Sequence, residues 1–223
     1  MVETSHLNSS DESISLVVDA STSPVQIGIP GLDSWNAIIP TEEHALEGLF
    51  FATEKALSVT KRKISEIDTI FFCEGPGSTL SLRIAAAFVR TLKWNNPHSS
   101  FSVLSYNALD LASILAPSPG CIIQAPFRIG LRFVRIPNQN PLLSEKKIIS
   151  EDQALNQYPS SYHLPDIRKR AKPVDPAKTL SYDLSKTKGL KDLLQISKPC
   201  PEILPYNPQA PVFKKWNPQL LKS

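Results

Sequence analysis

The first half of the chain carries two different spacings of apolar residues. Short runs rich in β-branched and aromatic residues predict strands over residues 14–19, 25–29, 35–39, 68–73 and 101–104. Longer segments with apolar residues three to four positions apart predict helices over residues 41–60, 79–93 and 106–115. The order βββαβαβα indicates an α/β fold with a mixed sheet, because strands that alternate with helices form parallel units.

The two long helices are each predicted to turn one apolar side toward the sheet. Thr41 offers a hydroxyl that would cap the first helix. The inward side of that helix is predicted to consist of Leu46, Leu49, Phe50, Thr53 and Leu57. The apolar side of the second helix is predicted to consist of Leu80, Ile84, Ala87, Phe88 and Leu92.

The second half of the chain is rich in proline. Of the 20 prolines, 12 lie from Pro137 onward, and regular helices and central strands tolerate few of them. Further strands are predicted over 121–124 and 128–136, and a linker or extended arm over 159–176. The predicted organisation is a flexible N-terminus (1–12), a first lobe (13–116), a reduced, loop-rich second lobe (117–158) and a proline-rich basic arm or C-terminal extension (159–223).

A glycine turn joins the strand at 68–73 to the helix at 79–93. Gly75 and Gly77 flank Pro76, and Ser78 is placed to cap the helix. Free N–H groups at the start of such a helix can bind a phosphate. However, no Gly-Lys-Ser/Thr sequence follows, and Pro76 lacks an N–H group. The residues therefore favour a tight structural turn over a phosphate-binding loop.

The same turn carries a resemblance to a known family. Residues 75–84 resemble the signature Gly-Pro-Gly-Ser-Phe-Thr-Gly-Leu-Arg-Ile of TsaB, also called YeaZ, a family that acts in bacterial threonylcarbamoyladenosine biosynthesis. The positions that agree are Gly75, Pro76, Gly77, Ser78, Leu82, Arg83 and Ile84. Thr79, Leu80 and Ser81 stand where the family has Phe, Thr and Gly. Residues 16–21 and 103–109 also resemble family segments, so that the similarity extends over about residues 14–115.

The resemblance implies a fold, a role and partners. TsaB proteins have the ribonuclease-H-like fold of actin, sugar kinases and heat-shock ATPases. They support a TsaD subunit in threonylcarbamoyl transfer to adenosine 37 of tRNA, with the ATPase TsaE joining, and they are not themselves catalytic. The contact with TsaD would be made by the helices at 41–60 and 79–93, with His44, Arg83, Ala86 and Arg90 as candidate interface residues. The alanines could equally pack against the chain's own sheet, and a homodimer could use the same helices.

Asp19 and Ser21 are the candidates for a nucleotide site. In the ribonuclease-H-like fold, Asp19 would stand where kinases and ATPases hold a metal or a phosphate. An Asp at a strand end either binds magnesium through water or caps a turn, and the cap is favoured because other ligands are not evident. We therefore expect no catalytic residues, no resident metal and no cofactor. A small-molecule kinase or ATPase that uses ATP and magnesium remains an alternative function, as does a TsaB-derived binding module outside the pathway.

Composition and charge agree with a soluble globular protein that lies in the cytoplasm. The N-terminus lacks the basic start and apolar centre of a signal peptide. The three cysteines, Cys73, Cys121 and Cys200, are far apart and odd in number, which favours reduced thiols. Residues 166–223 hold 12 Lys/Arg and 5 Asp/Glu, whereas the whole chain has a net charge of +3. The basic cluster 168–172 could contact tRNA phosphates, although a solvated surface segment is the favoured interpretation.

Overall fold

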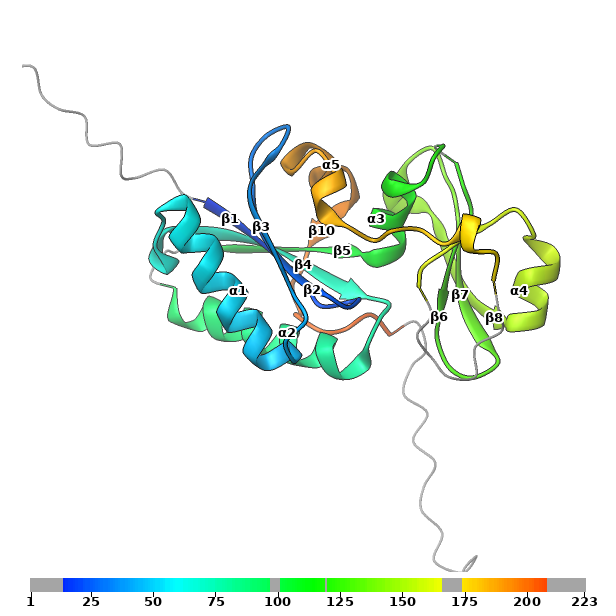
Figure 1. The fold of residues 1–223 in the computed structure, drawn as a ribbon, viewed down its shortest axis with the longest axis horizontal. Helices are drawn as coiled ribbons and strands as arrows, with labels where there is room; N and C mark the ends of the chain where they lie inside the picture. Colours follow the sequence, from blue (N-terminus) through cyan, green and yellow to red (C-terminus); the bar gives the residue numbers. More distant parts are fainter. Residues whose placement is uncertain (1–13, 97–100, 119, 166–173, 208–223) are drawn as a thin grey trace, which may run out of the picture.

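The computed structural model describes residues 14–96, 101–118, 120–165 and 174–207 (Figure 1). These residues form two lobes, each built around one sheet. The larger sheet is covered by α1 and α2 on one face and by α3 and α5 on the other, whereas the smaller sheet carries α4. The two sheets thus divide the described residues into a larger first lobe and a smaller second lobe.

The larger sheet has the strand order β10-β5-β4-β1-β2-β3. The hairpins β1–β2 and β2–β3 are antiparallel, whereas β4 lies parallel to both β1 and β5. The strands are β1 (Ile14–Asp19), β2 (Val25–Pro30), β3 (Trp35–Thr41), β4 (Ile67–Gly75), β5 (Ser102–Asn107) and β10 (Ser197–Pro199). The predicted order βββαβαβα is confirmed, and the structure adds β10, which pairs antiparallel with β5.

Alternation along the strands divides the core of the first lobe into two layers. Leu16 and Val18 face α1 and α2, whereas Val17 between them belongs to the core on the side of α3 and α5. The helices are α1 (Ala45–Thr60), α2 (Thr79–Asn95), α3 (Ala108–Leu115), α4 (Glu151–Gln157) and α5 (Leu190–Ile196). Among the described residues, no helix has the length and hydrophobicity that crossing a membrane requires.

The predicted start of α1 is wrong. The helix begins at Ala45 after His44, whose side chain makes no cap hydrogen bond. Thr41 ends β3 instead, and its Oγ1 accepts a hydrogen bond of 3.2 Å from the Glu43 N–H. The Thr41 hydroxyl therefore stabilises the turn before the helix.

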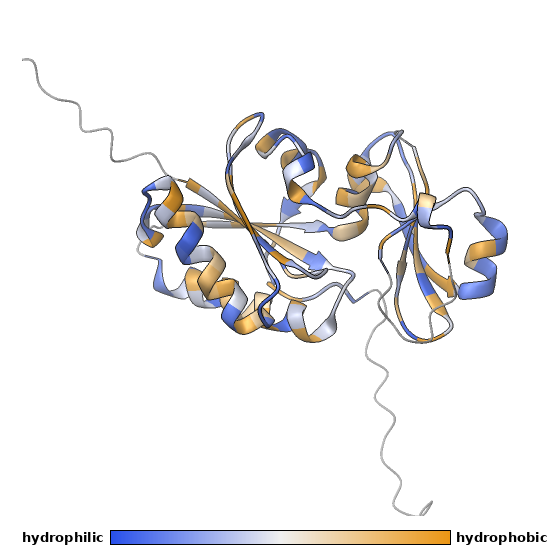
Figure 2. Ribbon diagram, in the orientation of Figure 1, coloured by the Kyte–Doolittle hydropathy of each residue, from blue (hydrophilic) through white to orange (hydrophobic). Residues whose placement is uncertain are grey.

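The predicted inward sides of α1 and α2 are only partly correct. Leu49 is buried as expected, but Leu46 and Phe50 are 51% and 57% exposed. In α2, Leu80 is 69% exposed, whereas Ala85, Ala86 and Val89 are fully buried. Small residues allow each helix backbone to lie close to the sheet, which leaves the longer side chains on the outer side. Hydrophobic turns on the outside of α1 are visible in Figure 2.

The second lobe has the strand order β8-β7-β6-β9. Its strands are β6 (Ile123–Pro126), β7 (Leu131–Ile136), β8 (Glu145–Ser150) and β9 (Tyr162–His163). β6 and β7 overlap the strands predicted over 121–124 and 128–136, although both begin later. Because β9 lies beyond residue 158, the predicted end of the second lobe is too early. Short 3-10 turns complete the structure: η1 (Ile64–Glu66), η2 (Pro141–Leu143), η3 (Pro176–Lys178) and η4 (Leu184–Lys186).

The C-terminal part of the chain returns to the first lobe. Leu184, Leu193 and Ile196 are buried against the α3 side of the larger sheet, and Ile203 joins the core on the α2 side. The described part of the predicted arm, 159–165 and 174–207, is therefore integral to the fold. Its apolar residues have no regular spacing, because each fills a separate gap between elements. The predicted flexible N-terminus, 1–12, lies outside the described residues.

Candidate functional site

The glycine turn between β4 and α2 packs directly against the loop between β1 and β2. A Cβ atom added at Gly77 would lie 2.1 Å from the Ser21 carbonyl oxygen. The Ser78 N–H donates to the same carbonyl at 3.3 Å, and the Ser78 hydroxyl accepts from the Ser81 N–H at 3.4 Å. The Ser78 cap is thus confirmed. The Ser78 N–H, which a phosphate-binding loop would need, is used within the protein, so the turn is structural.

Asp19 lies at the end of β1 and is 1% exposed. Its Oδ1 accepts hydrogen bonds from the Ser21 N–H (2.9 Å) and the Ser21 hydroxyl (2.6 Å). Its Oδ2 accepts from the hydroxyls of Tyr106 and Tyr182, each at 2.7 Å. Four donors occupy the acceptor positions of one carboxylate. The turn-capping role is therefore confirmed, and the carboxylate presents no open side to a magnesium ion.

Burial sets the protonation of the groups around Asp19. Burial, and then the charge of Asp19, raises the pKa of Cys73, Tyr106 and Tyr182 well above the usual values. The two tyrosines therefore stay protonated at neutral pH and remain hydrogen-bond donors. A buried thiol with a raised pKa is a poor nucleophile. All three cysteines of the chain are free, as expected, and Cys73 lies in β4 while Cys121 precedes β6.

A pocket of about 520 Å³ lies where the two lobes meet the start of α1 and α2. Ser21 and His44 line it, whereas Asp19 does not. The remaining lining residues are Thr22, Ser23, Val25, Glu42, Glu43, Ala45, Gly77, Ser78, Thr79, Ser81, Pro126, Phe127 and Pro165. Hydroxyl groups dominate its polar part, and the carboxylates of Glu42 and Glu43 disfavour an anion there.

The predicted interface residues occupy different environments. His44 and Arg83 are exposed, and Arg90 is half-buried with an Nε that has no hydrogen-bond partner among the described residues. Ala86 is fully buried in the core between α2 and the sheet, so the prediction that it lies on a partner surface is wrong. The basic cluster predicted to contact tRNA, 168–172, lies outside the described residues.

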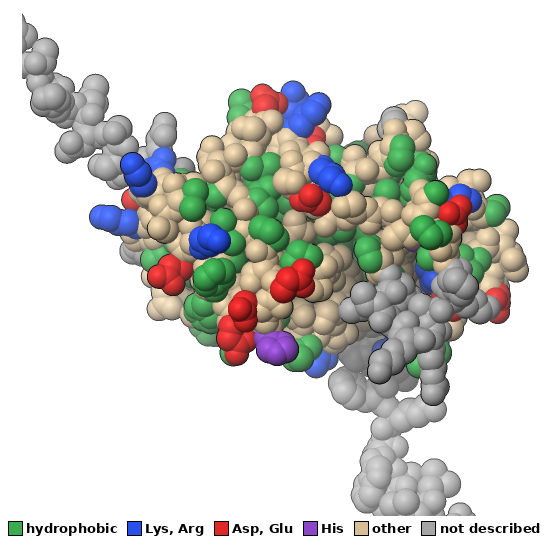
Figure 3. All heavy atoms as spheres, viewed as in Figure 1, with side chains coloured by type: hydrophobic (Ala, Val, Ile, Leu, Met, Phe, Trp, Pro, Cys, Tyr) green, Lys and Arg blue, Asp and Glu red, His purple; other side chains and the backbone are tan. Residues whose placement is uncertain are grey.

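The outer side of α1 and α2 exposes apolar residues that the sequence analysis assigned to the core. We define the α1–α2 face by Leu46 and Phe50 on α1 and by Leu80 and Arg83 on α2. The ring of Phe50 packs edge-on against Phe88 of α2, with centroids 5.2 Å apart, so the two helices form one continuous surface. Apolar side chains appear among charged ones on the α1 side of the molecule (Figure 3).

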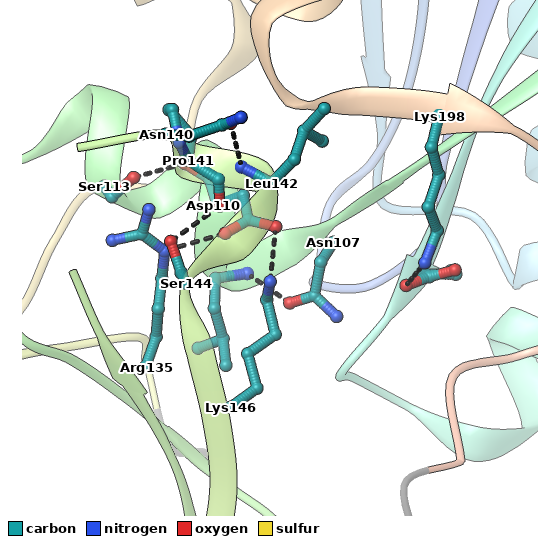
Figure 4. Close-up of polar contacts among 12 residues, drawn as sticks. Asn107, Asp110, Ser113, Arg135, Asn140, Pro141, Leu142, Ser144, Lys146 and Lys198 are labelled. Atoms are coloured by element: carbon teal, nitrogen blue, oxygen red, sulfur yellow. Dashed lines mark hydrogen bonds and ion pairs between the residues drawn. The ribbon is translucent and has the colours of Figure 1, made fainter. Parts of the chain in front are cut away.

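A buried ion cluster joins the two lobes. The carboxylate of Asp110 in α3 accepts from the Arg135 Nε of β7 at 2.7 Å and pairs with the Lys146 Nζ of β8 at 2.8 Å. Arg135 and Lys146 reach Asp110 from the second lobe (Figure 4). The sequence analysis missed this cluster, because its members lie in three elements and no local pattern marks them.

The comparisons with known proteins agree with this architecture. The profile of the TsaD family, described as tRNA N6-adenosine threonylcarbamoyltransferase, matches residues 38–121, which is less than half of the chain. A search of curated proteins finds no match. The structure is similar to YeaZ from Pseudomonas aeruginosa with a TM-score of 0.60 and 17% sequence identity, covering 87% of this chain and 99% of that one. The fold is that of YeaZ.

A second solved structure supports the same assignment of the fold. It is described as an uncharacterized protein with similarity to peptidase YeaZ from Pseudomonas aeruginosa, and it matches with a TM-score of 0.55 and 17% identity. The match covers 82% of this chain and 88% of that one. The ribonuclease-H-like fold predicted for the first lobe is thereby confirmed. The YeaZ match extends over both lobes, whereas the sequence resemblance covered only the first.

Proposed function

We propose that this protein is a non-catalytic subunit that supports threonylcarbamoyl transfer to adenosine 37 of tRNA by a TsaD-type transferase. The observation that carries the proposal is the exposed apolar surface of α1 and α2 on a YeaZ fold. Leu46, Phe50 and Leu80 are each more than half exposed, although shorter residues of the same helices are fully buried. Burying such a side chain in an interface would contribute about 1.5–3 kcal/mol.

The relation between the chain and TsaD supports pairing through these helices. The TsaD profile matches residues 38–121, a range that contains α1, β4, α2, β5 and α3. Two related lobes can associate through equivalent surfaces around an approximate twofold axis. The same geometry would allow a homodimer, so the partner and a second copy of the chain would compete for the α1–α2 face.

The surroundings of Asp19 and Cys73 support a non-catalytic role. Asp19, the candidate ligand for a metal or nucleotide, already accepts four hydrogen bonds within the protein. Cys73, the nearest thiol, is fully buried, and burial raises its pKa. The chemistry of transfer would therefore belong to the partner, while this chain supplies a binding surface.

The proposal is tested with the TsaD and TsaE proteins of the same organism. The purified chain is mixed with TsaD, and complex formation is measured by calorimetry at micromolar concentrations. Threonylcarbamoyladenosine is then measured in tRNA after reaction with TsaD, TsaE, ATP and an activated threonylcarbamoyl donor, with and without this chain. We expect a complex and a product that depends on the chain. If both proteins are folded and neither signal appears, the proposal is wrong.

A further inference from the structure

The helices α1 and α2 end at the same edge of the larger sheet. Because β1, β3 and β4 run in one direction, the helices that follow β3 and β4 both return to the edge where β4 begins (Figure 1). The Asn96 Nδ2, just after α2, donates to the Ile67 carbonyl oxygen at the start of β4 at 2.5 Å. Residues 61–66 connect α1 to β4, so this connection lies beside the end of α2.

Basic residues gather at this edge without acidic partners. We define the helix-end surface by Lys61 and Lys63 after α1 and by Arg90, Lys93 and Trp94 of α2. The three lysines are exposed and Arg90 is half-buried. None of these four cations forms an ion pair with a carboxylate of the described residues. Lys and Arg side chains are visible at the end of the molecule where α1 ends, on the left in Figure 3.

The acidic residues near the helix-end surface do not cancel its charge. Glu66 pairs with Arg62 at 3.3 Å, and Asp68 is half-buried in β4. With Arg62, the five cations of this edge and these two carboxylates leave a net charge of +3. Residues 54–55, earlier in α1, carry one charge of each sign. Residues 1–13 hold three acidic residues, which lie outside the described part of the chain.

Trp94 gives this basic surface an aromatic ring. Its side chain is 79% exposed, and its indole makes no ring contact with another described residue. Such a ring can stack on an unpaired base, while unpaired cations bind phosphates. The neighbouring Asn95 donates its Nδ2 to the Thr91 carbonyl oxygen at 3.0 Å, and its Oδ1 accepts no hydrogen bond among the described residues. This oxygen can accept from a base amino group, which RNA offers and an anionic membrane does not.

We propose that the helix-end surface binds RNA, with Lys61, Lys63, Arg90 and Lys93 at phosphates and Trp94 stacked on an unpaired base. RNA binding depends on this chain alone, whereas the identity of the RNA as the tRNA that TsaD modifies rests on the proposed function. Along α2, the helix-end surface begins about 15 Å beyond the Leu80 side of the α1–α2 face. The chain can therefore hold RNA at the helix ends while TsaD occupies the α1–α2 face.

The binding is tested on the full-length chain alone. A fluorescent anticodon stem-loop RNA with adenosine at position 37 is titrated with the chain, and its anisotropy is measured from about 50 to about 200 mM salt. The variant Lys61→Gln/Lys63→Gln/Lys93→Gln should bind about tenfold more weakly. It should also lower the slope of log K against log salt by about 2, because three phosphate contacts are lost. Trp94→Ala should weaken binding about fivefold or more, whereas Trp94→Phe, which still stacks, should keep most of the affinity.

A matched variant separates the helix-end surface from the overall charge. Lys186→Gln/Lys188→Gln/Lys191→Gln removes the same charge from exposed lysines around α5 and should change the affinity by less than about twofold. No binding at about 0.1 mM chain, or equal losses in the two triple variants, would overturn the proposal. It would also be overturned if replacement of the basic cluster 168–172 alone abolished binding. The same holds if the helix-end variants weakened binding to phosphatidylglycerol vesicles but not to RNA.

The role of this RNA contact is tested in the reaction with TsaD. The helix-end triple variant should form less threonylcarbamoyladenosine, while its affinity for TsaD stays unchanged. Normal product formation by a variant that has lost RNA binding would show that the bound RNA is not the substrate tRNA. If RNA binds as expected but no product depends on the chain, the proposed function fails and the RNA site stands. A TsaD complex without RNA binding would overturn the site and leave the proposed function intact.

Discussion

The hydroxyl of Tyr182 donates a hydrogen bond of 2.7 Å to the Asp19 carboxylate, although 163 residues separate the two in the sequence. Tyr182 comes from the C-terminal part of the chain that crosses back to the first lobe. It lies beside Asp19 at the end of β1, the residue that the sequence offered as a candidate nucleotide or metal ligand. The chain thus closes this position with its own side chain.

Replacing Tyr182 by Phe should destabilise the protein by about 1.5–3 kcal/mol, because a hydrogen bond to a buried carboxylate is lost. The free energy of unfolding in urea measures the effect. Tyr162→Phe is the control, since Tyr162 is half-buried and no hydrogen bond of its hydroxyl is seen among the described residues. Equal stabilities of the two variants would contradict the role of the Tyr182 hydroxyl.

Replacing Gly77 by Ala should destabilise the protein by about 2 kcal/mol or more, because the new Cβ would overlap the Ser21 carbonyl oxygen and backbone must move. Gly130→Ala is the control. Its φ of +76° disfavours alanine, but no atom lies within 4 Å of the added Cβ, so a loss of only about 1 kcal/mol is expected. Thermal unfolding of both variants measures the difference. A Gly77→Ala variant as stable as the control would contradict the packing of the turn against Ser21.

Replacing Asp110 by Asn should destabilise the protein by about 3 kcal/mol, because Arg135 stays buried without its counter-charge. Asp33→Asn removes an exposed pair with Lys191 and should cost less than about 0.5 kcal/mol. Urea unfolding compares the two variants, and hydrogen exchange shows whether β7 and β8 open first. Similar small losses would show that the cluster does not hold the lobes together.

Stability should fall between about pH 6.5 and pH 4 because of His163. Burial, and then the charges of Arg132 and Lys178, lowers the pKa of His163 to about 4. Its Nδ1 lies 3.4 Å from an Arg132 nitrogen, which can only donate, so the folded state holds a neutral ring. In acid the unfolded chain takes up this proton first, which would remove up to about 3 kcal/mol. His163→Gln should flatten the decline measured by urea unfolding, and an unchanged slope would refute the assignment.

Replacing Leu80 by Ser should weaken binding to TsaD about tenfold or more, as truncation of a central apolar contact does. Leu80 is 69% exposed, so the free protein should keep its stability. Ile129→Ser is the matched control, because Ile129 is 78% exposed but lies in the second lobe. Calorimetry with TsaD measures both affinities. Equal affinities would place the contact elsewhere.

The sequence by itself determined the elements of the first lobe. Apolar spacing predicted the order βββαβαβα, and local chemistry predicted the cap at Ser78, because both depend on residues close together in the chain. The spacing of apolar residues alone could not show which side of α1 and α2 faces the sheet. Leu80 and Ala85 are both apolar, and the closeness of helix and sheet decided that alanine is buried and leucine exposed.

Only the tertiary structure decided which side chains pair with the buried carboxylates of Asp19 and Asp110. The acceptor positions of Asp19 are filled partly by Tyr106 and Tyr182, and the charge of Asp110 is balanced by Arg135 and Lys146. These contacts join segments that lie far apart in the sequence, so no local pattern encodes them. They form because a buried charge must find partners wherever the folded chain brings them.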